Sequence, residues 1–379
     1  MCISIEESLP NEERMESDID TLTAQSEETQ KEAKDHIRKY KVQRELKNSI
    51  QSIARDDVVR KVPFKQRTHC LTIDMGQNLG LPNMEAEQVG DTYYFTPLTV
   101  FVFGVNDDSR PDGTSDQMNA YIWTEGDGKR GANNIASCLL KDYRARGFLS
   151  DGKNEGSLNI IADNCDGQNK NEDVIRFHMW LVEAGWFSEI NIIFLVKGHT
   201  KNACDRMFNL LKHEYHNLNV ESFSQLKTCL NKSLFVNVEE VGRHEFFDFS
   251  STLNKYYRSL KSGETNRTHI FTIKESVCST WLLKKDDADA PERIDKLLPT
   301  RRNKKALSLE PQERKIAIQN LLSDLTMLPA PGIPPIKQVE LYKKWRKVVS
   351  DEYKDITCPR PPEEVIQQVQ NDKKAKRKK

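Results

Sequence analysis

The residues of this chain that could do chemistry are three aspartates, each placed at the end or the start of an expected element. Asp74 closes an expected strand, and Asp163 directly follows the apolar run 158–162. Asp205 lies in the first turns of an expected helix. The carboxyl ends of strands are where open α/β sheets bind ligands and metals. The pattern therefore predicts an acidic site at one edge of a sheet.

Such a grouping suits phosphodiester cleavage, in which charge develops on the phosphate, the nucleophile and the leaving group. Two divalent ions about 4 Å apart can hold both the attacking and the leaving oxygen, and Mg²⁺ prefers carboxylate oxygens. We expect Asp74 and Asp163 to hold one Mg²⁺ (or Mn²⁺) ion, and Asp205 with either of them to hold a second. A metal-bound water or a DNA 3′-hydroxyl would be the nucleophile.

Further candidates line the same rim. The turn Gly198-His199-Thr200 would place the imidazole of His199 beside the carboxylates, in reach of a metal, the phosphate or the attacking water. Four residues are predicted to contact nucleic acid or to position Asp163: Asn164, Gln168, Lys170 and Lys201.

Each candidate also has a purely structural interpretation. Asp74 could form a turn at its strand end, and Asp163 or Asp166 could cap the following helix. Asp205 could stabilise the positive end of its own helix. His199 could bond to backbone at a helix entry, and an amide-rich turn could satisfy its own backbone. The residues alone leave both interpretations open.

The elements that would position these residues follow a distinctive order. Three strands (69–74, 93–105, 118–124) precede a helix ending near 146, a strand (158–162), a helix ending at 185, a strand (190–196) and a helix (203–214). This β-β-β-α-β-α-β-α order predicts an antiparallel meander followed by parallel strands. It is the layout of a ribonuclease H-like mixed α/β sheet, whose carboxylates occupy the places of Asp74, Asp163 and Asp205.

Four segments are expected along the chain: a polar, partly disordered helical arm (1–60), the ribonuclease H-like domain (65–260), a helical extension (261–358) and a basic disordered tail (359–379). The arm contains an expected helix over 27–54 with a thin apolar stripe. That helix could pack on the domain or form a homo-oligomer. Beyond residue 215 we predict helices over 223–234, 247–260, 311–325 and 342–353, and a strand over 269–273.

Charge and cysteine usage narrow the class of protein. The 57 basic and 57 acidic residues give no net charge, but basic residues cluster at 301–305 and 373–379. Such clusters predict DNA binding and a nuclear location, although a solvated tail has the same composition. The 8 cysteines form no CxxC pair, which favours reduced thiols over a zinc module. We expect neither a signal peptide nor a membrane partner, since no apolar run approaches about 20 residues.

Two motifs resemble a known family. Asp163-Asn164-Cys165 with Gly167-Gln168-Asn169-Lys170-Asn171, followed by Gly198-His199-Thr200 and Asp205, is similar to the eukaryotic, transposase-like domain of unknown function 7869. The resemblance covers roughly residues 65–260. It implies a ribonuclease H-like fold of the DDE/DDD transposase and integrase type, with Asp74, Asp163 and Asp205 as its triad. The implied function is transposon-derived, divalent-metal-dependent cleavage or transfer of DNA strands.

The chain departs from the pattern of these proteins in three respects. Lys201-Asn202-Ala203-Cys204 stands where the family usually has acidic residues, and the third carboxylate is Asp where most transposases of this fold use Glu. No upstream helix-turn-helix or zinc finger is evident, as expected of a fragment, a partner-dependent protein or a domesticated relic. The alternatives are therefore a catalytically inactive nucleic-acid-binding protein or a protein-interaction protein. A nuclease of RNA–DNA hybrids is a variant of the main hypothesis.

Overall fold

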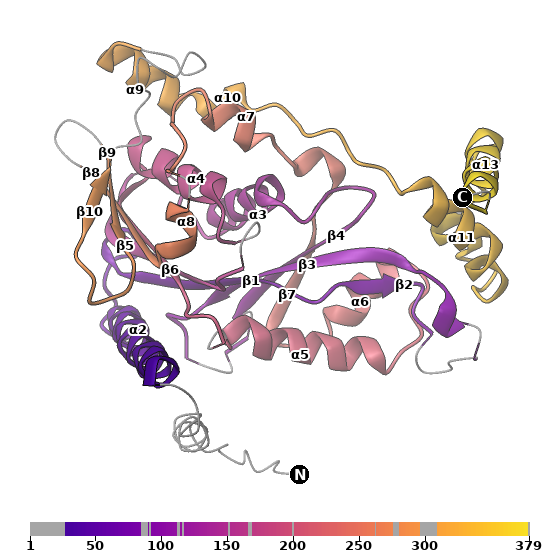
Figure 1. Ribbon diagram of the computed structural model, residues 1–379, viewed down its shortest axis with the longest axis horizontal. Coiled ribbons are helices and arrows are strands. Elements are labelled where there is room, and N and C mark those ends of the chain that lie inside the picture. The colour runs from indigo at the N-terminus through magenta and orange to yellow at the C-terminus, as the bar shows by residue number, and fades with distance from the viewer. Residues whose placement is uncertain are drawn as a thin grey trace, which may run out of the picture.

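The computed structural model describes residues 27–84, 90, 92–111, 114–115, 117–150, 152–165, 169–198, 201–261, 263–275, 280–295 and 309–377. These residues form a mixed α/β fold around a ten-stranded sheet (Figure 1). Its strands are β1 (His69–Met75), β2 (Leu79–Leu81), β3 (Leu98–Asp107), β4 (Met118–Thr124), β5 (Asn154–Ala162), β6 (Phe187–Phe194), β7 (Val236–Glu240), β8 (Ile270–Glu275), β9 (Thr280–Lys285) and β10 (Arg293–Asp295).

The sheet places β1 near its middle. The strand order is β10-β9-β8-β6-β5-β1-β3-β4-β7, and β2 pairs with β3. On one side of β1, β3 is antiparallel to β1 and β4 is antiparallel to β3. On the other side, β5 is parallel to β1 and β6 is parallel to β5. The parallel strands β1 and β5 therefore end at the same edge of the sheet.

Helices cover both faces of the sheet. The α-helices of the described residues are α2 (Glu27–Val59), α3 (Ala132–Ala145), α4 (Glu172–Glu183), α5 (Ala203–His216), α6 (Phe223–Leu230), α7 (Phe249–Leu253), α8 (Glu264–Arg267), α9 (Pro311–Gln319), α10 (Leu321–Asp324), α11 (Pro335–Lys343), α12 (Lys354–Thr357) and α13 (Glu363–Arg377). Helices α3, α4 and α7 share a core with one face, and α5 and α6 share a core with the other. Within the described residues, no helix is long and apolar enough to cross a membrane.

Side-chain alternation along β1 decides which face carries the polar residues. Successive strand residues point to opposite faces, and Leu71, Ile73 and Met75 belong to the core under α3 and α4. Thr72 and Asp74 therefore point to the face that α5 covers. Cys204 of α5 contacts the Thr72 carbonyl oxygen from that side, with its Sγ at 3.2 Å.

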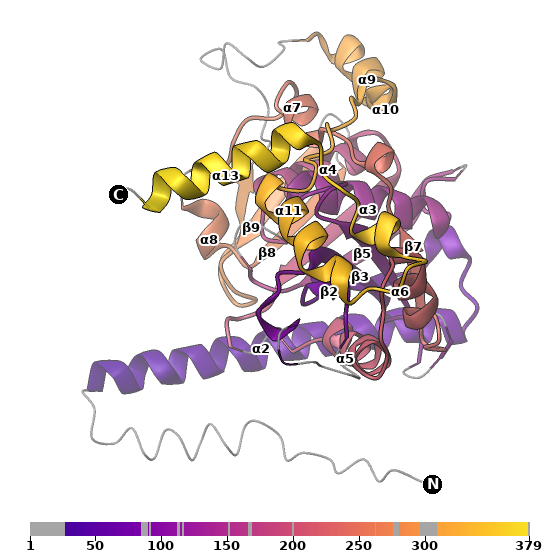
Figure 2. The ribbon, with the colours of Figure 1, turned by 90° about the vertical axis from the view of Figure 1, so that its right-hand side faces the viewer.

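The N-terminal helix α2 packs on the same face as α5. Ala54 and Ile50 join a small apolar cluster with Cys70, Ile161 and Leu195. The expected helix over 27–54 is confirmed and is longer, ending at residue 59. Figure 2 shows that its N-terminal end extends beyond the body of the domain. A homo-oligomer formed through this helix stays a prediction.

Several other elements differ from those expected. The helix expected over 247–260 is only α7, because Asn254 caps it, and the buried Tyr256 and Tyr257 follow in irregular chain. No single helix covers 342–353; α11 begins early, at Pro335, and ends at residue 343. The chain after 359, expected to be disordered, contains α13. Its apolar residues Ile366 and Val369 pack with Val339 of α11, and such packing stabilises a helix that propensity alone would not.

Candidate acidic site

The three predicted aspartates lie on neighbouring elements. Ile73 of β1 pairs with Ala162 of β5, so the residues that follow them, Asp74 and Asp163, leave adjacent parallel strands at the same edge. Asp205 lies in the first turn of α5, which packs against β1 and β3. All three are partly buried. The sheet register and the placement of α5 bring together what lies far apart in the sequence.

Asp74 accepts three hydrogen bonds. Its Oδ1 receives the backbone N–H of Met75 at 2.7 Å and Nδ2 of Asn169 at 3.3 Å, and its Oδ2 receives Nδ2 of Asn202 at 2.9 Å. The pKa of Asp74 is raised to about 6, mainly by burial and in smaller part by the charges of Asp163 and Asp205, while the hydrogen bonds from Asn202 and Met75 oppose the rise. A carboxyl with this pKa changes its protonation state close to neutral pH.

Asn202 joins Asp205 to Asp74. The backbone N–H of Asp205 donates to Oδ1 of Asn202 at 3.1 Å, and the backbone N–H of Asn202 donates to Oδ2 of Asp205 at 3.0 Å. This is a reciprocal capping box at the start of α5. The structural interpretation of Asp205 therefore holds for one of its oxygens, while its charge still acts on Asp74.

Two amide oxygens beside the carboxylates have no hydrogen-bond partner within the described part of the chain. Oδ1 of Asn164 and Oδ1 of Asn169 are both buried and unpaired. The Asn164 side chain bonds through Nδ2 to Nε2 of His269, at 3.2 Å. Buried polar atoms without partners are uncommon in folded proteins and point to a missing donor, water or ion.

The other predicted site residues differ in their burial and in their position relative to the aspartates. Lys170 is buried, donates to the Asn266 carbonyl oxygen at 2.8 Å and lies over the Phe194 ring. It is therefore placed in the interior and not on the expected rim. Lys201 is exposed, next to Asn202. His199 and Gln168 lie outside the described residues.

Helix α4 begins later than the amide-rich turn suggested. The residue that caps it is Asn171, whose Oδ1 accepts the backbone N–H of Asp173 at 2.8 Å. Asp163 does not have this role, and Asp166 lies outside the described residues.

Sequence reasoning missed two residues of the site. Asn202 touches Asp74, and His269, the residue before β8, touches Asn164. The Asn202-x-x-Asp205 spacing is a capping-box pattern and could have located the first. No local signal marks His269, because it reaches the site only through the pairing of β8 with β6.

The types of ligand at this site suit a divalent cation, but in the described part of the chain their arrangement does not form a metal site. Carboxylate and amide oxygens are the ligands that Mg²⁺ prefers. Within the described residues, however, no group of three or more His, Cys, Asp or Glu side chains lies close enough to hold a metal. Asn202 instead provides an N–H to one oxygen of Asp74.

The fold and the site together define a mixed α/β domain with an acidic cluster at the end of two central strands. Residues 97–288, just over half of the chain, match the family described as "Domain of unknown function (DUF7869)", and the chain belongs to this family. The match includes Asp163 and Asp205 and begins after Asp74. No curated protein and no solved structure matches the chain.

Proposed function

We propose that this protein cleaves or transfers nucleic-acid strands, with DNA as the substrate, at the cluster of Asp74, Asp163 and Asp205. The proposal assigns the domain to the ribonuclease H-like class of transposases and integrases. A nuclear location, inferred from the basic clusters, accompanies it; residues 301–305 lie outside the described part of the chain.

The arrangement of strands supports this class. In a ribonuclease H-like sheet, the first strand lies in the middle, with the second and third strands antiparallel on one side and the fourth and fifth parallel on the other. The sequence β1, β3, β4, β5 and β6 has this order and these directions. The first strand and the end of the fourth then offer Asp74 and Asp163 side by side.

The observation that carries the proposal is the placement of Asp74 and Asp163 at the ends of paired parallel strands, with Asp205 in the first turn of the helix packed against β1. The pKa of Asp74 agrees with it: burial is the largest cause of its rise to about 6, and the charges of Asp163 and Asp205 add to it. Perturbed carboxyls cluster at functional sites.

The residues at the site would have separate roles. Asp74, Asp163 and Asp205 are the residues that would hold the cation. When bound, a divalent cation stabilises the charge that develops on a phosphate during strand cleavage. Asn202 orients Asp74 through its 2.9 Å hydrogen bond. The exposed Lys201 is placed to contact a phosphate of the strand.

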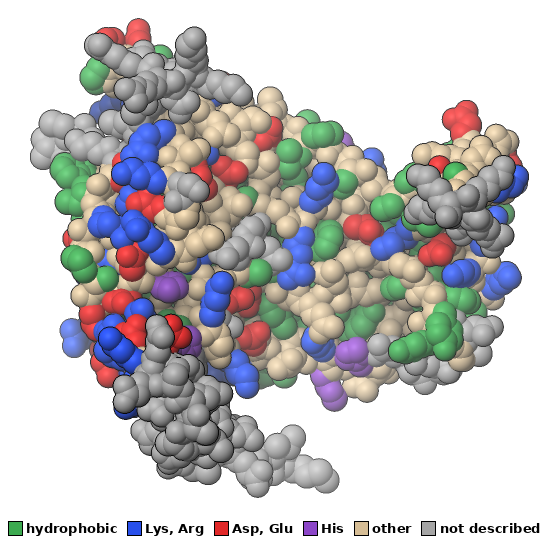
Figure 3. Space-filling model, viewed as in Figure 1, with side chains coloured by type: hydrophobic (Ala, Val, Ile, Leu, Met, Phe, Trp, Pro, Cys, Tyr) green, Lys and Arg blue, Asp and Glu red, His purple; other side chains and the backbone are tan. Residues whose placement is uncertain are grey.

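Charge on the surface gives limited support for nucleic-acid binding. Figure 3 shows Lys and Arg side chains intermingled with Asp and Glu over the face viewed in Figure 1. Nucleic-acid binding would then depend on individual cations near the site, such as the exposed Lys201. The affinity should fall with salt, as it does whenever phosphates are neutralised by lysine and arginine.

Nicking of supercoiled DNA in Mg²⁺ or Mn²⁺ tests the proposal. We expect the wild-type protein to nick and Asp163→Asn to lose the activity, with EDTA abolishing it. Asp351→Asn is the matched control, because Asp351 is an exposed aspartate far along the chain, paired only with Lys354 among the ion pairs described. If Asp163→Asn nicks as well as Asp351→Asn does, the proposal is wrong.

The second candidate is a nucleic-acid-binding protein without catalysis. The capping box between Asn202 and Asp205 favours it, since a carboxylate oxygen of the cluster is already hydrogen-bonded. This candidate predicts salt-sensitive DNA binding that neither requires divalent cations nor changes in Asp163→Asn. Nicking that depends on both would eliminate it.

A further inference from the structure

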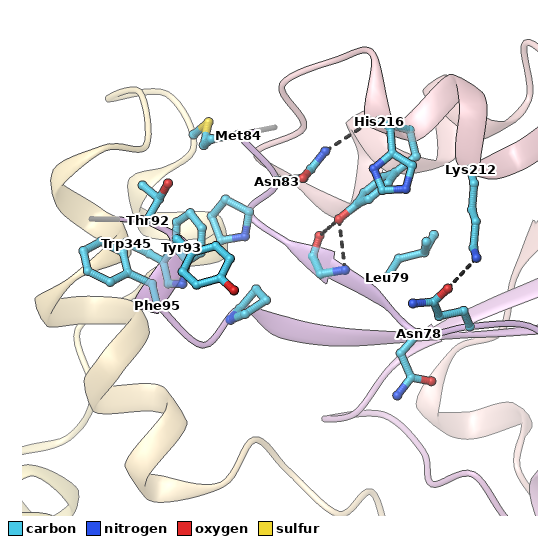
Figure 4. Close-up of a pocket in the computed structure, with 15 residues that line it drawn as sticks. Asn78, Leu79, Asn83, Met84, Thr92, Tyr93, Phe95, Lys212, His216 and Trp345 are labelled. Carbon is cyan, nitrogen blue, oxygen red and sulfur yellow. Dashed lines mark hydrogen bonds between the residues drawn. The ribbon is translucent and has the colours of Figure 1, made fainter. Parts of the chain in front are cut away.

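A cavity of about 290 Å³ lies at the far end of α5 from the acidic cluster. It is enclosed by the segment after β1, the short helix Thr92–Tyr94, the C-terminal end of α5 and Trp345 of the C-terminal region (Figure 4). This volume lies near the lower end of the range for small-molecule pockets, roughly 300–1,000 Å³. It suits one planar ring system.

One side of the cavity is aromatic. Figure 4 shows Tyr93, Phe95 and Trp345 close together on that side. Phe95 and Trp345 meet edge to face, with ring centroids 5.5 Å apart. The side chain of Tyr93 is 74% exposed, although exposing a large ring to water costs free energy. An aromatic surface left uncovered beside a cavity is a surface on which another ring can stack.

The opposite side of the cavity is polar and cationic. Lys212 and His216 of α5 lie there with Asn78 (Figure 4). Lys212 donates to Oε1 of Gln77. Of the described residues that line the cavity, none is acidic. This charge pattern admits an occupant attached to phosphate and disfavours a cationic one.

Helix α5 runs from Asp205, at the acidic cluster, to Lys212 and His216, which line the cavity. Gln77, Leu79 and Lys212 also line a smaller cavity, which includes Gly76, two residues after Asp74. Along the axis of α5, Asp205 is separated from Lys212 and His216 by about 10 and 16 Å at 1.5 Å per residue. At 3.4 Å per nucleotide of one strand, this distance corresponds to about three to five nucleotides.

We propose that this cavity binds an unpaired nucleobase of the strand held at the acidic cluster, stacked on Tyr93. The inference rests on the proposed function, because the strand it describes is the substrate of that site. A base held in the cavity would fix the strand a few nucleotides away from the carboxylates. This contact would favour single-stranded or locally opened substrates.

Binding of a single-stranded oligonucleotide that contains 2-aminopurine tests the inference, in EDTA and at constant low salt. We expect Tyr93→Ala to weaken binding about tenfold, as the loss of a stacking partner does, and to remove the 2-aminopurine fluorescence change. Tyr94→Ala is the matched control: Tyr94 is 77% exposed on the same short helix and meets the Tyr93 ring only edge to face, with ring centroids 5.2 Å apart, but it does not line the cavity. It should bind within about twofold of wild type.

The outcomes separate the inference from the proposed function. If Tyr93→Ala and Tyr94→Ala bind alike, or if duplex binds as well as single strand, the inference is overturned, whereas nicking lost in Asp163→Asn still supports the function. If Tyr93→Ala alone loses binding but no variant or wild type nicks DNA, the cavity is supported and the catalytic function fails. Absence of any nucleic-acid binding overturns both.

Discussion

Asn202 donates a hydrogen bond from its Nδ2 to Oδ2 of Asp74, at 2.9 Å, across the boundary between α5 and β1. The same side chain caps α5 through its Oδ1. One amide therefore couples the position of a helix to the charge of a strand-end carboxyl. The pKa of Asp74 depends on whether that helix start is formed.

Asp74 should make the folded protein less stable as the pH rises from about 4 to about 6. Its pKa is 3.8 in the reference state and about 6 in the folded protein, so the folded state holds the proton more tightly through this window. Stability is then greater below it and lower above it, by up to about 3 kcal/mol. Asp74→Asn should remove most of this loss, measured by urea denaturation at pH 4 and pH 7. A pH 7 stability equal to wild type would contradict the prediction.

Asn202→Ala should raise the pKa of Asp74 above about 6, because the hydrogen bond from Asn202 lowers it. The loss of the helix cap should also cost about 1 kcal/mol. Ser222→Ala is the control: Ser222 caps α6 in the same way, through Gln225, without touching Asp74. Carboxyl-carbon NMR titration of the two variants distinguishes them, and an unshifted Asp74 in Asn202→Ala would refute the coupling.

Lys284 should be among the most sensitive charged residues of the fold. Its Nζ lies 2.8 Å from Glu264 and 3.1 Å from Asp295, and the side chains of Lys284 and Glu264 are 4% and 6% exposed. Lys284→Met leaves both carboxylates without this partner, and we expect a loss of about 3–5 kcal/mol. Lys285→Met, at a neighbouring and more exposed ion pair, should cost at most about 1 kcal/mol. Chemical denaturation measures both, and similar losses would contradict the argument.

Gly156 should not tolerate a side chain. A Cβ built there would lie 2.0 Å from the backbone carbonyl oxygen of Arg67, so backbone must shift. We expect Gly156→Ala to destabilise the protein by about 3 kcal/mol, near the upper end for overpacking. Gly242→Ala, whose nearest contact would be 3.7 Å away, should change the melting temperature little. If Gly156→Ala and Gly242→Ala had the same melting temperature, the close contact between the backbones of Gly156 and Arg67 would not be rigid.

Local patterns in the sequence were enough to locate the strands that carry Asp74 and Asp163 and the helix that carries Asp205. Strands and helices are indicated by apolar periodicity and by turn residues, which are properties of neighbouring positions. The same local information failed where packing decides, as for α13, which is helical because Ile366 and Val369 find a partner in α11.

The sequence by itself determined which carboxylates stand at the ends of elements, since that depends on a few adjacent residues. Only the tertiary structure decided what surrounds them. The Asn202 bond to Asp74, the burial of Lys170 and the approach of His269 to Asn164 all join residues about 95 or more positions apart. Such contacts follow from strand order and helix placement, and the energy of any one of them is too small to be read from its own sequence neighbourhood.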